Sequence, residues 1–197
     1  MNMNKETATT PGKQKKSNLK SSVNDIVMIS LFTALIAICS QITIPSPTIP
    51  FTLQTLTIFI AGGILGCKKG TISIVVYIIL GIIGIPVFAQ FSSGLGAILG
   101  MTGGYIIGFV FTAFITGLMC EKLGRKLWVL VLSMSIGLIV CYAFGTVWFI
   151  AIYSQKIESI GLWSALSMCV FPFLIFDAAK IACAAIIVNR LDKVIKF

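Results

Sequence analysis

The chain has 197 residues, of which 57% are hydrophobic and 11% are charged, and its mean hydropathy is +1.03. A soluble domain of this length cannot bury that much apolar surface, so the composition predicts an all-α integral membrane protein of the cell membrane. In a soluble protein, a net charge of +9 would suggest a nucleic-acid partner. In a membrane protein, the positions of the basic residues instead indicate the topology, so we expect no nucleic-acid partner. The chain has no histidine, and none of its six cysteines forms a C-x-x-C pair, so we expect no metal, no cofactor and no enzymatic activity.

The first half of the chain predicts a tail and three membrane spans. Residues 1–25 are polar and lysine-rich, which predicts a disordered basic cytoplasmic tail. The first apolar run, at 26–44, ends where three prolines (Pro45, Pro47 and Pro50) prevent the helix from continuing. The second run, at 53–67, stops at Lys68-Lys69-Gly70, and the third covers 71–88. These runs predict three transmembrane helices.

The second half predicts three more spans and one helix that does not cross. A glycine- and serine-rich connection leads to the fourth run, at 99–120, and the fifth covers 127–152. The last apolar region is too long for one perpendicular helix, and Pro172 offers a break. We therefore expect a loop helix at 158–170 in the outer interface and a sixth span at 172–193.

The basic residues give a second, independent view of this layout. Thirteen of the 15 lysines and arginines lie in the tail, the 68–69 turn, the 121–126 turn and the C-terminus, which share one side of a six-span chain. Basic residues mark the cytoplasmic side, so both termini are predicted to be cytoplasmic. The opposite connections contain only Lys156.

A carboxylate and an ammonium stand three residues apart in the last apolar run, at Asp177 and Lys180. Nearly one helical turn separates them, so both side chains emerge on one face. Each costs about 3 kcal/mol at membrane depth unless it meets a partner or a cavity. The pair either neutralises itself and fixes helix packing, or it binds a polar ligand.

The outward connections are rich in proline and glycine, and the charged pair lies just beneath them. Irregular backbone at membrane depth is tolerated where it is buried or lines a cavity, which predicts an outward-facing ligand cavity. Besides the charged pair, four polar residues near this end of the helices are candidate ligand contacts: Gln54, Gln90, Ser92 and Tyr105. Each of the four can instead be a packing residue.

Four glycines with overlapping spacings, Gly100, Gly103, Gly104 and Gly108, lie near the same predicted cavity. Such spacing is typical of close helix packing, and bare backbone can also approach a ligand. We expect packing at Gly108 and ligand approach at Gly103 and Gly104.

The first span carries a stripe of small and polar residues at helical spacing: Ser30, Thr33, Ala34, Ala37 and Gln41. Helices associate in lipid through close backbone approach, so this stripe predicts a docking surface for another helix. The spacing leaves open whether that helix belongs to this chain or to a partner.

Four motifs together resemble the biotin-specific substrate-binding subunits, the S components of the BioY family, of energy-coupling-factor (ECF) transporters. The resemblance covers residues 26–193, and Met101 stands where the family pattern usually has proline. The motifs are Ile-Pro-Phe-Thr-Leu-Gln-Thr-Leu at 49–56, Gly-Ile-Ile-Gly-Ile-Pro-Val-Phe-Ala at 81–89, Thr-Gly-Gly-Tyr-Ile-Ile-Gly-Phe at 102–109 and Asp-Ala-Ala-Lys at 177–180.

The resemblance implies that residues 26–197 form a six-helix domain that binds biotin near the outer surface, with Asp177 and Lys180 in the site. It also implies that the small-residue face of the first helix meets a membrane coupling subunit. It further implies that two partner ATPase subunits supply ATP hydrolysis, in agreement with the lack of a Walker motif in this chain. The alternative is a self-sufficient secondary transporter or facilitator for biotin or another small vitamin.

Overall fold

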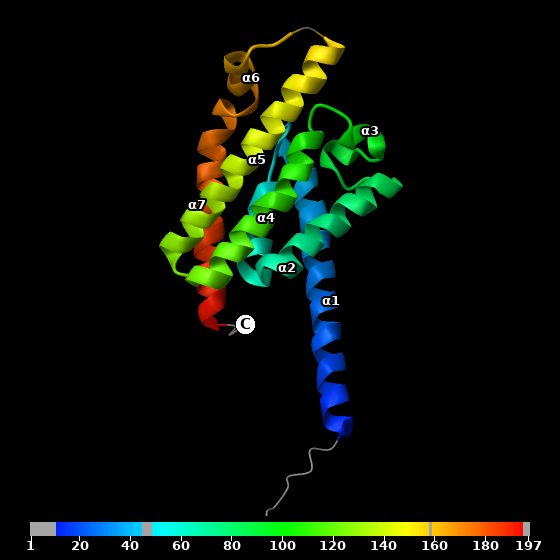
Figure 1. The fold of residues 1–197 in the computed structure, drawn as a ribbon, viewed down its shortest axis with the longest axis vertical. Coiled ribbons are helices and arrows are strands. Elements are labelled where there is room, and N and C mark those ends of the chain that lie inside the picture. Colours follow the sequence, from blue (N-terminus) through cyan, green and yellow to red (C-terminus); the bar gives the residue numbers. More distant parts are fainter. Residues whose placement is uncertain (1–10, 45–48, 158, 195–197) are drawn as a thin grey trace, which may run out of the picture.

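The structure, a computed structural model, describes residues 11–44, 49–157 and 159–194 and is all-α apart from one short hairpin (Figure 1). Within these residues, five helices are long and apolar enough to cross a membrane. They are α1 (Pro11–Gln41, apolar from Ser22), α2 (Gln54–Ile83), α4 (Gly103–Leu123), α5 (Leu127–Lys156) and α7 (Phe171–Val194). The prediction of an all-α membrane protein is therefore confirmed.

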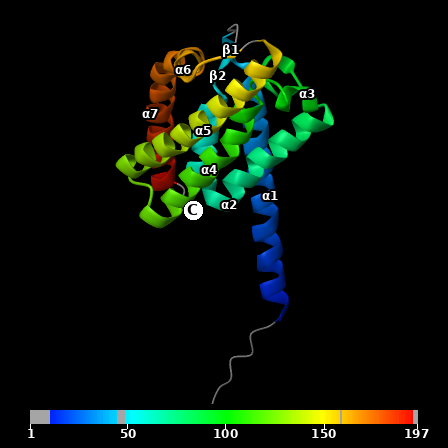
Figure 2. The ribbon, with the colours of Figure 1, turned by 45° about the horizontal axis from the view of Figure 1, so that its top comes forward.

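Short elements gather at one end of this helix bundle, which we call the hairpin end (Figure 2). Strands β1 (Thr43–Ile44) and β2 (Phe51–Thr52) pair antiparallel there. The other short elements are the 3₁₀ helix η1 (Ala89–Phe91), α3 (Leu95–Ile98) and α6 (Leu162–Cys169). The predicted loop helix is thus present as α6, whereas Glu158, at its predicted start, lies outside the described residues.

The two spans predicted at 53–67 and 71–88 both lie in α2, which reverses direction at Gly66 rather than at the lysine pair. Gly66 has φ 78° and ψ −173°, a conformation that glycine adopts without steric cost. A Cβ on Gly70 would lie 3.0 Å from the carbonyl oxygen of Ala61, so the chain folds back on itself. Helix α2 therefore has a first arm (residues 54–65) and a second arm (67–83), and the structure has five candidate spans where the sequence predicted six.

Helix α1 begins before the first predicted span. The structure places residues 11–25, predicted to be part of a disordered tail, inside α1. Proline suits the first position of a helix, and the lysine and glutamine residues that follow have good helix propensity. The rest of that predicted tail, residues 1–10, lies outside the described residues.

The remaining boundaries follow from glycine and proline. The left-handed Gly84 (φ 113°) ends the second arm, so this helix stops five residues short of the predicted 88. Pro172 lies in the first turn of α7, where its missing N–H costs no hydrogen bond, and this confirms the predicted break.

Small residues allow the long helices to approach closely. Helix α4 packs between α2 and α5, and α7 packs against both of those neighbours (Figure 1). A Cβ on Gly108 of α4 would lie 2.8 Å from the sulfur of Cys141 in α5, and one on Gly117 would lie 2.4 Å from the backbone nitrogen of Cys67. The predicted packing role of Gly108 is confirmed.

Two side chains, Glu121 in the last turn of α4 and Arg125 in the turn that follows, cap the two arms of α2 at the end of the bundle away from the hairpin. Arg125 donates from Nε to the carbonyl oxygen of Gly63 (2.9 Å) and from Nη2 to that of Ile64 (3.0 Å), which closes the end of the first arm. The second arm begins with the N–H of Cys67, which donates to Glu121 Oε1 at 2.8 Å. A broken helix leaves orphan carbonyls and N–H groups, and these two side chains satisfy some of both kinds.

Candidate functional site

Two neighbouring cavities lie at the hairpin end of the bundle, with volumes of about 270 Å³ and 50 Å³. The first arm of α2, together with α4, contributes to both. They share five lining residues, Ile49, Pro50, Thr52, Tyr105 and Phe109, so they form two compartments of one site.

Gln54 gives the larger cavity its main polar group. The residue is only 4% exposed, and its Nε2 has no hydrogen-bond partner among the described residues. Thr52 orients the start of the helix, because its Oγ1 accepts a hydrogen bond from the Gln54 backbone N–H at 3.3 Å. A buried donor without a partner is costly, so the amide is ready to donate to a ligand.

Gln90 and Ser92 line the same cavity from its exposed margin. Gln90 has the positive φ of 57°, which is uncommon for a residue other than glycine. Ser92 Oγ donates to the Ala89 carbonyl oxygen at 2.8 Å, so its hydroxyl proton is already used. The loop therefore contributes a shaped wall and the amide of Gln90.

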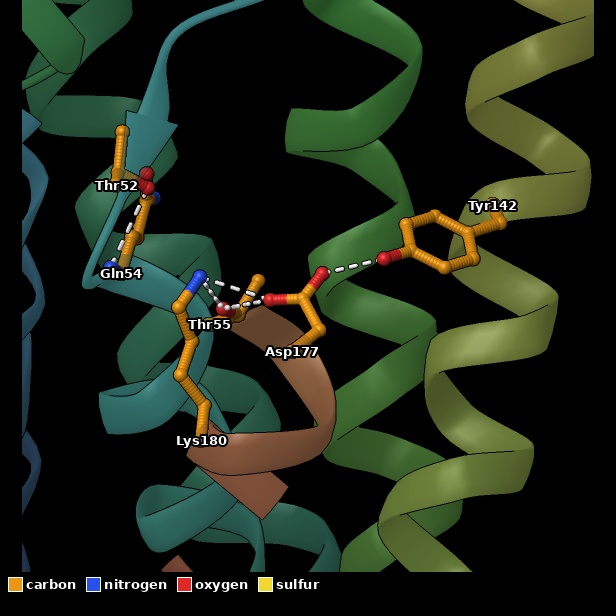
Figure 3. A network of polar contacts seen from close by, with 6 residues as sticks. All are labelled: Thr52, Gln54, Thr55, Tyr142, Asp177 and Lys180. Atoms are coloured by element: carbon orange, nitrogen blue, oxygen red, sulfur yellow. Dashed lines mark hydrogen bonds and ion pairs between the residues drawn. The ribbon is translucent and has the colours of Figure 1, made fainter. Parts of the chain in front are cut away.

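The charged pair lines the smaller cavity (Figure 3). Lys180 Nζ lies 2.8 Å from Asp177 Oδ1, and the two side chains are 11% and 3% exposed. Both come from one face of α7, as the three-residue spacing predicts. The pair neutralises itself, and at the same time it borders empty space.

Two residues that the sequence analysis did not assign to the site complete this cluster. Thr55 Oγ1 donates to Asp177 Oδ1 and accepts from Lys180 Nζ, both at 3.1 Å. Tyr142, which projects from α5 toward α7, donates its hydroxyl to Asp177 Oδ2 (Figure 3). Both are polar side chains at membrane depth, and no other feature of the sequence points to them.

Tyr105 connects the two compartments because it lines both. The side chain is 7% exposed, and its hydroxyl lies 3.3 Å from Thr146 Oγ1 of α5. Cys169 also lines the smaller cavity, and burial raises the pKa of its thiol to about 11, so the thiol is neutral at ordinary pH.

Gly103 and Gly104 do not match the prediction that they approach a ligand. Neither lines these two cavities. A Cβ on Gly103 would lie 1.6 Å from the Ile98 carbonyl oxygen, and one on Gly104 would lie 2.3 Å from the Cβ of Trp148. The structure gives both glycines a packing role at the start of α4 instead.

The predicted docking stripe on α1 divides between two faces. Ser30 and Ala34 are exposed, and Ala37 is half-buried. Thr33 is buried and donates to the Ser73 carbonyl oxygen of the second arm at 2.9 Å, so it packs within the chain. Of these four residues, Ser30, Ala34 and part of Ala37 remain available to another helix.

The geometry favours binding over catalysis. Among the described residues, Lys180 uses two of its three N–H donors, on Asp177 and Thr55, and the Gln54 amide contributes unpaired donors in the adjoining compartment. An ion pair of opposite charges is poor acid–base machinery. The fold and site define a multi-pass membrane protein with an internal, donor-rich binding cavity.

Comparison with known proteins gives the family. The BioY family model matches residues 11–197, and the chain belongs to the BioY family. It is 38% identical over 171 residues to a biotin transporter BioY of Thermotoga maritima, covering 87% of this chain and 97% of that one. It is 40% identical over 168 residues to a probable biotin transporter BioY of Pyrococcus horikoshii, covering 85% and 96%.

A solved structure supports the same assignment. It is the S-component for biotin from an ECF-type ABC transporter, and it superposes with a TM-score of 0.78 at 29% identity. The match covers 94% of this chain and 95% of that one. The bundle described above is therefore the S-component fold.

Proposed function

We propose that this chain captures biotin with high affinity for uptake, as the S component of an ECF-type ABC transporter. The family and the similar S component for biotin support this function. One observation supports the site best. Two adjoining cavities contain a buried Gln54 amide without a partner among the described residues and, in the other compartment, a buried Asp177–Lys180 ion pair.

The chemistry of biotin suits these groups. Its ureido oxygen and its carboxylate accept hydrogen bonds, which the Gln54 amide and the remaining Lys180 donor can supply. Its ureido N–H groups need an acceptor, which a carboxylate such as that of Asp177 can supply. Its fused rings are apolar at the sulfur side, and the shared walls at Ile49 and Phe109 are apolar too.

We assign residues 26–197 to the biotin-binding membrane domain and count the two arms of α2 separately, which gives six membrane segments. The first arm is about 18 Å long at about 1.5 Å per residue, too short to cross alone, so the 49–53 stretch would complete its path. The basic turns and the C-terminal end lie opposite the hairpin end (Figure 1). With basic residues inside, the termini are cytoplasmic and the cavity faces outward.

The partners that this function needs are a membrane coupling subunit and two ATPase subunits. The exposed Ser30 and Ala34 offer the coupling subunit a place where helix backbones can approach closely. The ATPases would drive reorientation of the chain in the bilayer.

The test is saturable binding of isotopically labelled biotin by the purified chain. Asp177→Asn and Lys180→Met should each weaken binding at least tenfold, because each leaves the other charge buried and unpaired. Asp192→Asn makes the same chemical change in α7 away from both cavities and should bind as the unchanged chain does. Unchanged affinity in Asp177→Asn would reject the site, and biotin accumulation by the chain alone in proton- or sodium-loaded liposomes would favour a secondary transporter.

A further inference from the structure

Tyr142 stands between the binding site and a second, different space. It lines the smaller cavity with Asp177, and it also lines a groove of about 500 Å³ between α5, α6 and α7. The other residues of that groove are apolar except for Thr146, and Ile139 and Val147 on its rim are 64% and 68% exposed. The Tyr142 ring is therefore part of the wall between a charged cluster and a surface that faces lipid.

The hydroxyl of Tyr142 fixes one half of the Asp177 carboxylate. Oδ1 accepts from Lys180 Nζ at 2.8 Å and from Thr55 Oγ1 at 3.1 Å, and Oδ2 accepts from Tyr142. These donors come from α7, α2 and α5, so three helices hold the carboxylate from different directions (Figure 3). A carboxylate held in this way cannot turn about its terminal bond without breaking a hydrogen bond.

This orientation decides what the ammonium can do. With Oδ2 occupied by Tyr142, Lys180 meets only Oδ1 and has one N–H donor left for a ligand. Without the tyrosine hydroxyl, Oδ2 loses this donor, and the Lys180 ammonium, 2.8 Å from Oδ1 of the same carboxylate, can swing toward it. The ammonium would then bridge both oxygens and turn its remaining donor away from the cavity.

We propose that Tyr142 is a positioning residue for biotin capture: its hydroxyl holds Asp177 so that Lys180 keeps a donor free for the ligand, and its ring closes the site against lipid. The proposal rests on the proposed function, because it assumes that the charged pair binds biotin. Tyr142 itself acts through Asp177.

The test compares biotin affinities of purified full-length variants. Tyr142→Phe keeps the ring and removes the hydroxyl, and it should weaken biotin binding about 10-fold to 100-fold, as expected for one hydrogen bond to a charged group. Tyr153→Phe removes the same atom from the same helix, outside both cavities, and should change affinity less than twofold. Tyr142→Ala also removes the wall and should weaken binding further than Tyr142→Phe.

A double-mutant cycle separates positioning from general support of the fold. In Asp177→Asn, adding Tyr142→Phe should cost little more, because the hydroxyl acts through that carboxylate. Where Asp177→Asn binds too weakly to titrate, Thr55→Val takes its place, and the combined loss should be smaller than the product of the two single losses. The melting temperature of each ligand-free variant is measured alongside.

Each of the following results overturns the proposal. The first is that Tyr142→Phe binds biotin as tightly as Tyr153→Phe does while Asp177→Asn has lost binding. In that case the proposed site stands and only the role of Tyr142 is rejected. The second is strict additivity in the cycle, or a Tyr142→Phe chain that folds poorly while its folded fraction binds normally. The third is unchanged affinity in Asp177→Asn, which removes the proposed binding site together with this role of Tyr142.

Discussion

Replacing Arg125 with alanine removes the side chain that closes the first arm of α2. Its guanidinium donates to the carbonyl oxygens of Gly63 and Ile64, and Nη1 lies 2.8 Å from Asp192 Oδ1 of α7. In the variant the two carbonyl groups lose these donors and the turn loses its ion pair with α7, although the Asn189 side chain of α7 still donates to the backbone carbonyl oxygen of residue 125 at 3.0 Å. Of the two side chains that cap the α2 reversal, the variant retains only Glu121.

The size of the loss follows from these contacts. Each hydrogen bond from the guanidinium to a helix-end carbonyl contributes about 1.5 kcal/mol, the lower end of the range for charged donors, because water can reach this end of the bundle. The ion pair contributes at most about 1 kcal/mol, since the Asp192 side chain is 37% exposed. The expected destabilisation of Arg125→Ala is roughly 3 to 4 kcal/mol, which corresponds to a fall of roughly 10 °C in the melting temperature.

The chain contains its own reporter for this measurement. Four of its six cysteines, Cys67, Cys120, Cys141 and Cys169, are buried, so a thiol-reactive fluorophore signals unfolding on heating. Lys126→Ala removes one exposed positive charge from the same turn and should change the melting temperature by no more than about 2 °C. Arg125→Lys should fall between the two, because an ammonium cannot serve both carbonyls and the carboxylate at once. The capping argument is refuted if Arg125→Ala has the same melting temperature as Lys126→Ala, or if Arg125→Lys has the same melting temperature as the unchanged chain.

Three further substitutions test separate parts of the structure. Gln54→Leu should weaken biotin binding at least tenfold by equilibrium titration while leaving the melting temperature equal or higher, because it removes a buried amide that lacks a partner; a lower melting temperature would contradict this. Gly66→Ala should cost about 1 to 2 kcal/mol by thermal unfolding, since φ is 78° and the new Cβ would lie 2.3 Å from Glu121 Oε1. Gly104→Val should lower the melting temperature by more than Gly66→Ala, because its Cβ would overlap the Cβ of Trp148 at 2.3 Å; equal stability would show that α4 and α5 separate easily.

Hydropathy and turn residues predicted most of the fold, because each long helix must be apolar over nearly its whole length in lipid. The break at Pro172 was predictable because proline lacks a backbone N–H, which is a property of the residue itself. The position of the α2 reversal was not, because Lys68-Lys69-Gly70 has the stronger turn signal in the sequence. The reversal occurs at Gly66, where Arg125 caps carbonyl groups that lie about 60 residues away in the chain, and such a contact leaves no local pattern.

The candidate site divides in the same way. Asp177, Lys180 and Gln54 were predictable because polar groups at membrane depth need a reason to be there. Gly103 was predicted to approach a ligand. The same small-residue spacing also occurs where helices pack closely, so the sequence alone does not distinguish the two roles. The Ile98 carbonyl oxygen beside Gly103 indicates packing. Tyr142 was missed because an aromatic residue in an apolar helix is usually a packing residue.

The first arm of α2 connects the two cavities with the capped reversal. At one end of the arm, Gln54 and Thr55 face the cavities, and Thr55 is bonded to the charged pair. Near the other end, about 13 Å away at about 1.5 Å per residue, Gly63 and Ile64 are held by Arg125. The charged pair and the capped reversal are therefore bonded near opposite ends of one helical arm of about three turns, so the same short element positions both.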